Sequence, residues 1–355
     1  MKIFLLFIVV SFAVSCANEN GDYTSLHPIQ EKMSYANSDA KKLKILDGGD
    51  FLKIFPESVQ LLYNFLNNEF GNLNAEELQI LTTNDIDVKS INNSDLLILE
   101  KDEARLIQFN LNNNEYVIIA NKGRGPGDLF FPKELSVNKG QAFVGMQAFQ
   151  ISMFSCESKL CEYDKTFNTE FNNYSVAPVD DFIKFLGVKP FGLEQYPDPS
   201  NIDQNLIHKM DYNSEINLSF FPIYDFRSSI VREKMHSGGQ VRSFPEIETI
   251  VITFDFFPYL YLFNEVGELI TKYEIPEYIQ AYYESEKSRN GGFTGRLIYG
   301  SNSNISHTMK LDDRWLLMRI REQRDVEFIS MEEGFDGYEW FSYYAFDVEE
   351  KKYIK

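Results

Sequence analysis

Residue types that often carry chemistry are scarce in this sequence. Its 355 residues include 4 His, 3 Cys and 2 Trp. No two His stand at the HxxxH or HxH spacing of a metal site, and no G-x-S-x-G sequence supplies the nucleophile of a hydrolase. The sequence therefore assigns no catalytic residue, no metal ligand and no cofactor.

Positive charge is also scarce, with 34 Lys and Arg against 53 Asp and Glu, a net charge of −19. An acidic surface repels a phosphate backbone, so nucleic acid is not an expected partner. Hydrophobic residues make up 44% of the chain. That fraction is enough for a large buried core and argues against disorder.

Helical periodicity and alternating βαβ patterns are rare as well, which argues against a Rossmann fold or an α/β barrel. One helix is expected over 276–290, which opens with Pro and closes at Gly. Elsewhere the chain reads as short apolar strands separated by turns, and its 31 Phe and 20 Tyr favour strands.

A recurring dipeptide, an aromatic residue followed by Asn or Asp, closes several of these strands just before a turn. The ring is expected to pack between sheets while the short polar side chain bonds the turn. The intervals between copies scatter around those of four-stranded propeller blades. The copies are Phe109-Asn110, Tyr163-Asp164, Phe263-Asn264 and Phe346-Asp347, with Tyr224-Asp225 as a further candidate.

The N-terminus predicts export. Lys2 precedes an apolar run over 3–14, too short to span a bilayer as a helix, and small and aliphatic residues lead into Cys16. We expect a lipoprotein signal, cleaved before Cys16, whose thiol receives a lipid. An ordinary cleaved signal with an incidental Cys16 is the alternative.

Three segments follow from this pattern. Residues 1–15 form the signal peptide, 16–42 a flexible tether, and 43–355 the globular domain. The expected location is the cell envelope, with the protein lipid-anchored in the periplasm or at the outer-membrane surface.

The remaining two cysteines, Cys156 and Cys161, are separated by four residues. Outside the cytoplasm such a pair oxidises readily, so a disulfide across a hairpin end is expected. A zinc half-site is the alternative, although no second Cys pair accompanies it.

A turn rich in Gly occupies 121–132 and reads NKGRGPGDLFFP. Three Gly and one Pro within five residues impose a tight reversal between two strands. No GK[ST] follows, which disfavours a phosphate cradle. Arg124 is a candidate contact for an anionic or sugar ligand, or else ties turn carbonyls or pairs with Asp128.

This turn resembles the GxGPGEF…P signature of six-bladed β-propeller lipoproteins, a TolB-like and NHL-like group of Gram-negative bacteria. Asp128 stands where that group usually has Glu, and Leu129 where it has Phe. The matching residues are Gly123, Arg124, Gly125, Pro126, Gly127, Asp128 and Pro132.

The resemblance implies an all-β, six-bladed propeller of four-stranded antiparallel blades, closed by strands from both chain ends, with a few loop or helical insertions. A strand near 44–46 is expected to complete the C-terminal blade. The function expected is binding or scaffolding of a glycan, a peptide or an envelope protein. A propeller lyase or hydrolase, and a structural subunit of an envelope complex, are the alternatives.

The lipid anchor can be tested directly. Cells expressing the chain with labelled palmitate should yield a labelled protein that lacks residues 1–15, and Cys16→Ser should carry no label. A wild-type protein that is cleaved but unlabelled would show that the signal is an ordinary one.

Overall fold

The structure is a computed structural model. It describes residues 23–28, 40–42, 45–46, 86–92, 94–113, 115–147, 149–188, 205–222, 238–279, 282–287, 293–298, 302–311, 313–323 and 339–354. The expected signal peptide, Cys16 and the dipeptide Tyr224-Asp225 lie outside these residues. No helix among the described residues is long and apolar enough to cross a membrane.

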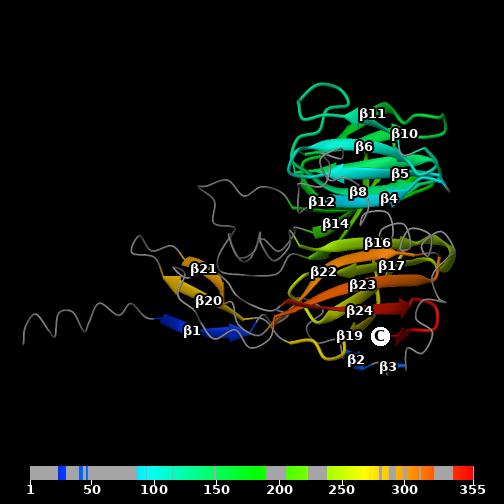
Figure 1. Cartoon of the computed structure of the whole chain (residues 1–355). Coiled ribbons are helices and arrows are strands. Elements are labelled where there is room, and N and C mark those ends of the chain that lie inside the picture. Colours follow the sequence, from blue (N-terminus) through cyan, green and yellow to red (C-terminus); the bar gives the residue numbers. More distant parts are fainter. Residues whose placement is uncertain are drawn as a thin grey trace, which may run out of the picture.

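The described strands form a β-propeller of five blades (Figure 1). In each blade four consecutive strands pair antiparallel, and the first strand is innermost. Blade 1 contains β4(Ile86–Ser90), β5(Asp95–Glu100), β6(Arg105–Asn110) and β7(Tyr116–Ala120); blade 2 contains β8(Pro132–Asn138), β9(Gln141–Met146), β10(Gln150–Ser155) and β11(Glu162–Asn168). Blade 3 contains β12(Asn172–Val179), β13(Phe182–Val188), β14(Asn205–Asp211) and β15(Ile216–Pro222); blade 4 contains β16(Gln240–Phe244), β17(Thr249–Thr253), β18(Tyr259–Asn264) and β19(Leu269–Glu274), with a short 3-10 helix at Pro245–Ile247; blade 5 contains β22(Asn302–Lys310), β23(Trp315–Gln323), β24(Glu339–Asp347) and β25(Lys352–Ile354).

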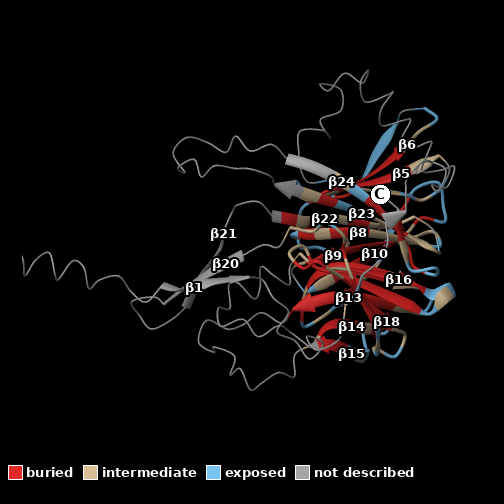
Figure 2. Cartoon of the chain, turned by 90° about the horizontal axis from the view of Figure 1, so that it is seen from below, coloured by how far each residue is buried: buried red, intermediate tan, exposed pale blue. Residues whose placement is uncertain are grey.

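In blades 1 to 4 the middle strands are buried on both faces, whereas β23 of blade 5 alternates between buried residues and residues that are partly or fully exposed. Strand β5 is buried over Leu96–Glu100, whereas the outer strand β7 exposes its first three residues. Figure 2 shows the same contrast, with buried residues concentrated in the blade interiors. Apolar runs such as TIVIT in β17 therefore form strands that have no solvent face.

The recurring dipeptide marks the end of the third strand in three blades. Asn110, Asn264 and Asp347 each end that strand, and the Oδ1 of each accepts a hydrogen bond from the N–H two residues on. Asp211 does the same in blade 3, after Met210 rather than an aromatic residue. Tyr163-Asp164 differs, because it lies near the start of β11.

The expectation of six blades is wrong for the described chain, which forms five. The described residues outside these blades include a separate three-stranded sheet. In that sheet β20(Tyr282–Lys287) pairs with β21(Phe293–Ile298) and with β1(Tyr23–Pro28), to one side of the blades in Figure 1. The helix expected over 276–290 is also wrong, since β20 occupies its second half.

N-terminal strands complete the last two blades. β2(Lys41–Lys42) pairs in parallel with β19, and β3(Ile45–Leu46) pairs in parallel with β25. The expected strand near 44–46 therefore does extend the C-terminal blade. Part of the segment expected as a tether, Tyr23–Pro28, forms β1.

Candidate functional site

The connections between strands differ in length on the two faces of the propeller. Where the inner strands end, tight turns join neighbouring strands, such as 139–140 between β8 and β9; we call this the tight-turn face. Where the inner strands begin, longer stretches of chain separate successive strands of the blades; we call this the long-connection face. These stretches include 121–131, 189–204, 223–239, 275–301 and 324–338. Long connections on a rigid scaffold are where binding residues concentrate.

The inner strands are linked to one another around the propeller axis by side chains. The inner edge of each has no strand beside it, so its N–H and C=O groups need other partners. A side chain from the preceding blade accepts a hydrogen bond from the next inner strand at the same place each time. The four bonds run from Leu135 N to Asp87 Oδ2 (3.0 Å), Val176 N to Glu134 Oε2 (2.8 Å), Val241 N to Ser175 Oγ (3.0 Å) and Thr308 N to Gln240 Oε1 (2.7 Å).

Arg242 crosses the axis from blade 4. Its Nη2 lies 2.6 Å from Glu134 Oε1 of blade 2, and its Nη1 donates to Ser175 of blade 3 over 3.2 Å. On the other side, its Nε and Nη2 donate to the carbonyl of Thr308 in blade 5. The Arg242 and Glu134 side chains are only 9% and 7% exposed, so this ion pair is buried between the inner strands.

His307 holds the fifth equivalent place, in blade 5 beside Asp87 of blade 1. Burial lowers the pKa of His307 to about 3, against the opposing pull of the Asp87 charge. Burial alone would raise the pKa of Asp87, but Lys89, His307 and the Leu135 N–H together lower it. At neutral pH this pair is an uncharged imidazole beside a carboxylate.

The Gly-rich turn extends from the long-connection face. Asp128 Oδ2 accepts from Gly125 N at 2.8 Å, and a Cβ at Gly123 would lie 2.1 Å from the same oxygen. Gly127 has a positive φ of 81° and packs against Tyr163 of β11. The turn therefore lies against the outer strand of blade 2, away from the axis, and Pro132 begins β8.

Arg124 at the tip of this turn stacks on an aromatic ring. Its guanidinium carbon lies 4.6 Å from the centroid of Phe130, and the residue is exposed. Asp128, which the sequence offered as its ion-pair partner, instead holds the backbone of the turn.

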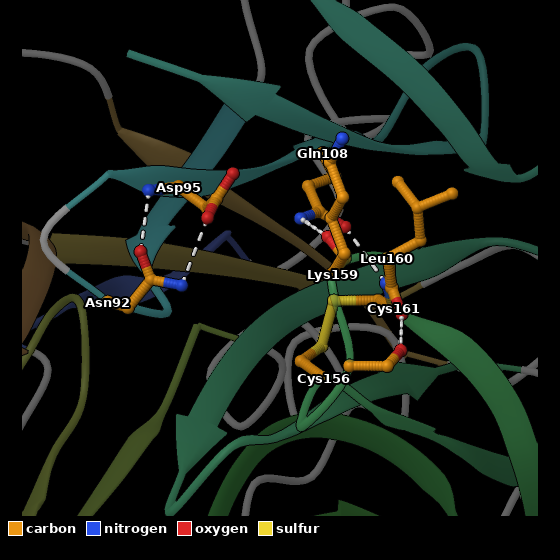
Figure 3. The surroundings of a disulfide bond; sticks show 8 residues. Asn92, Asp95, Gln108, Cys156, Lys159, Leu160 and Cys161 are labelled. Carbon is orange, nitrogen blue, oxygen red and sulfur yellow. Dashed lines mark hydrogen bonds between the residues drawn. A yellow bond between two sulfur atoms is a disulfide. The ribbon is translucent and has the colours of Figure 1, made fainter. Parts of the chain in front are cut away.

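Cys156 and Cys161 form a disulfide on the tight-turn face, across the β10–β11 turn (Figure 3). The turn is clamped to blade 1 by Gln108 of β6. The Gln108 side chain donates to Lys159 O at 3.0 Å and accepts from Cys161 N at 2.9 Å. This disulfide thus belongs to the junction between blades 1 and 2.

A carboxyl group lies on the long-connection face between blades 4 and 5. Burial raises the pKa of Asp255 well above its usual value. Its side chain packs on Gly238, where a Cβ would lie 2.2 Å from Oδ2. Tyr278 donates its hydroxyl proton to the backbone oxygen of Asp255 at 2.6 Å, and burial raises the pKa of that hydroxyl well above 10.

Sequence reasoning found the Gly-rich turn and the cysteine pair but missed the axial residues. Asp87, Glu134, Gln240 and His307 are isolated polar residues in first strands. They share one signal, an equivalent place in each blade, which becomes visible only when the blade register is known. No cluster of three or more His, Cys, Asp or Glu suited to a metal is present among the described residues.

Comparisons with known proteins return structures rather than families. No family model matches the chain, so its resemblance to the TolB-like and NHL-like group stays a prediction. No curated protein matches either.

Three solved structures similar to this chain share little sequence identity with it. A candidate exported protein of Bacteroides fragilis is 12% identical, with a TM-score of 0.48. The match covers 95% of this chain and 77% of the Bacteroides fragilis chain. A DUF4221-family member from Bacteroides vulgatus is 12% identical, with a TM-score of 0.46, and the match covers 77% of this chain and 80% of that protein. Hydrazine synthase of Kuenenia stuttgartiensis is 11% identical, with a TM-score of 0.40, and the match covers 75% of this chain and 64% of the hydrazine synthase chain.

The axial ion pair should dominate the stability of the inner ring. Arg242→Met leaves the Glu134 carboxylate buried without its cation, and such a change costs about 3 kcal/mol. Urea unfolding should show this loss, and Glu134→Gln in the same chain should recover part of it. Lys139→Met, which breaks an exposed pair with Asp180, is the matched control and should leave the midpoint unchanged. Equal urea midpoints for Arg242→Met and Lys139→Met would contradict a buried axial pair.

His307 should make the fold sensitive to mild acid. Its pKa is lower in the folded protein than the 6.5 expected when unfolded, so the unfolded chain binds a proton first as the pH falls. The resulting loss of unfolding free energy is about 2 kcal/mol between pH 7 and pH 5. Urea unfolding at both pH values should show a smaller loss for His307→Gln. An identical loss in the variant would assign the acid sensitivity to other groups.

Proposed function

We propose that this protein is a lipid-anchored, extracytoplasmic β-propeller that binds its ligand on the long-connection face. The observation that carries the proposal is the asymmetry between the faces. Ten or more residues separate successive strands at several places on the long-connection face, and tight turns join them on the other. Long connections held by a rigid sheet assembly are suited to recognition.

The inner strands favour a site away from the axis. Arg242 of blade 4 and Glu134 of blade 2 form a buried ion pair between the inner strands. The axial polar groups are also committed to one another through the cross-blade hydrogen bonds. Binding is therefore assigned to the rims and connections rather than to the axis.

The cell envelope is the proposed location. Support comes from the N-terminal sequence, whose apolar run ends just before Cys16. The disulfide between Cys156 and Cys161 fits an oxidising compartment. A glycan, a peptide or another envelope protein is the class of partner available there.

Cleavage of the bound ligand is a second candidate function, favoured by Asp255. A carboxyl group whose pKa is raised by burial is a type of group that enzymes use as a general acid. Asp255 lies on the long-connection face, where the proposed ligand binds. Release of a shortened product during a binding assay would distinguish cleavage from binding alone.

The proposal predicts where a bound ligand protects the backbone. The full chain is screened against arrays of oligosaccharides and peptides and against solubilised envelope proteins, and each binder is mapped by hydrogen–deuterium exchange. Protection is expected at 121–131, 147–149, 169–171 and 254–258, all on the long-connection face.

The tight-turn segments at 139–140, 180–181 and 265–268 serve as the internal control and should exchange at unchanged rates. Protection confined to these turns would refute the assigned face. Failure of every class of probe to bind would count against a binding module.

A further inference from the structure

Two phenylalanine residues stand out on the long-connection edge of blade 2. Phe131 directly precedes β8 and is 59% exposed, and Phe149 directly precedes β10 and is 40% exposed. Gln147 N donates to Phe131 O at 3.0 Å, so the two segments lie side by side. Thr169 N donates to Phe149 O at 2.7 Å, which fixes the second position.

Both residues have a left-handed backbone. The φ angles are 50° at Phe131 and 62° at Phe149, a region that is costly for a bulky side chain and that glycine occupies readily. Burial of the rings does not compensate for this cost, because both are exposed. In turns a left-handed residue has a local explanation, whereas an exposed aromatic ring in this conformation is consistent with a contact to a ligand.

Phe130 connects Phe131 to the Gly-rich turn. Phe130 and Phe131 are in edge contact, with centroids 4.4 Å apart, and the Arg124 guanidinium lies over Phe130. Stacking fixes the plane of the guanidinium, while its N–H edge remains the part that can bind a carboxylate in bidentate fashion. The surface therefore combines flat apolar faces with one positioned cation.

We propose that Arg124, Phe130, Phe131 and Phe149 form a subsite for an acidic oligosaccharide, an inference that rests on the function proposed above. The C–H faces of sugar rings pack on aromatic rings, and a uronate carboxylate pairs with Arg124. The net charge of the protein does not oppose this contact strongly, since charges beyond about 10 Å are screened at physiological salt.

A peptide strand fits the same surface less well. Recognition of an extended peptide depends on main-chain hydrogen bonds to an open strand edge. Here the carbonyls of Phe131 and Phe149 are already bonded to Gln147 and Thr169. A sugar chain needs only ring faces and a partner for its carboxylate, which this surface supplies.

The test is calorimetric titration of the full chain, in detergent, with tetramers of galacturonate, mannuronate and glucuronate. Tetramers of galactose, mannose and glucose are the neutral counterparts. At 0.15 M salt, at least one uronate tetramer should bind tenfold or more tightly than its neutral counterpart.

Three variants locate the subsite. Phe131→Gly and Phe149→Gly should each weaken uronate binding at least tenfold while the melting temperature stays the same or rises, because glycine relieves the left-handed backbone. Arg124→Gln should reduce uronate affinity to that of the neutral tetramer. Ser214→Gly relieves a left-handed residue, with φ of 69°, on the tight-turn face and should leave binding unchanged.

Each outcome is decisive. Absence of binding to every uronate tetramer, or equal binding by all the variants, would overturn the subsite. A fall in melting temperature in both Phe variants, without loss of binding, would assign the rings a structural role. If peptides or envelope proteins bind and protect the long-connection face while uronates do not, the subsite fails and the proposed function stands.

Discussion

The satisfaction of the inner strand edges is the constraint on which this propeller depends. Each first strand pairs on one side only, and its other edge faces a buried axis where water cannot replace a sheet partner. Asp87, Glu134, Ser175 and Gln240 meet this need by bonding the N–H of the next inner strand. Arg242 adds bonds to the carbonyl of Thr308 and to Glu134 across the axis. The cluster of polar and charged residues at the centre thus has a structural explanation, and its presence there does not by itself indicate an active site.

The sequence predicted the type of fold correctly but not the number of blades. Short apolar strands, scarce helical periodicity and the turn-forming dipeptides indicated four-stranded blades, and Asn110, Asn264 and Asp347 end third strands as that reasoning requires. The expected number of six blades came from the resemblance of the Gly-rich turn to a family signature, not from blades counted along the sequence. The dipeptide could not supply that count, because blade 3 ends its third strand with Met210-Asp211 and blade 2 with Phe154-Ser155. Part of the chain outside the blades pairs instead as β1, β20 and β21.

The candidate site was less predictable, because it depends on contacts between residues far apart in the chain. The Gly-rich turn was visible as a motif, and Arg124 was a named candidate. That Arg124 stacks on Phe130 rather than pairing with Asp128 depends on how the turn folds back on blade 2. The exposure and left-handed backbone of Phe131 and Phe149 leave no pattern in the sequence, since a Phe before a strand is usually part of the core.

The pairing of β2 and β3 with the last two blades has a consequence for how the chain folds. These strands precede every blade in the sequence, yet their partners β19 and β25 are separated from them by most of the polypeptide. Closing so large a loop costs conformational entropy, and contacts of this range slow folding. If the N-terminus is exported first, both strands wait unpaired until nearly the whole chain has followed. Blade 5 is then the last part to become complete, because residues 45–46 pair with the final strand of the chain.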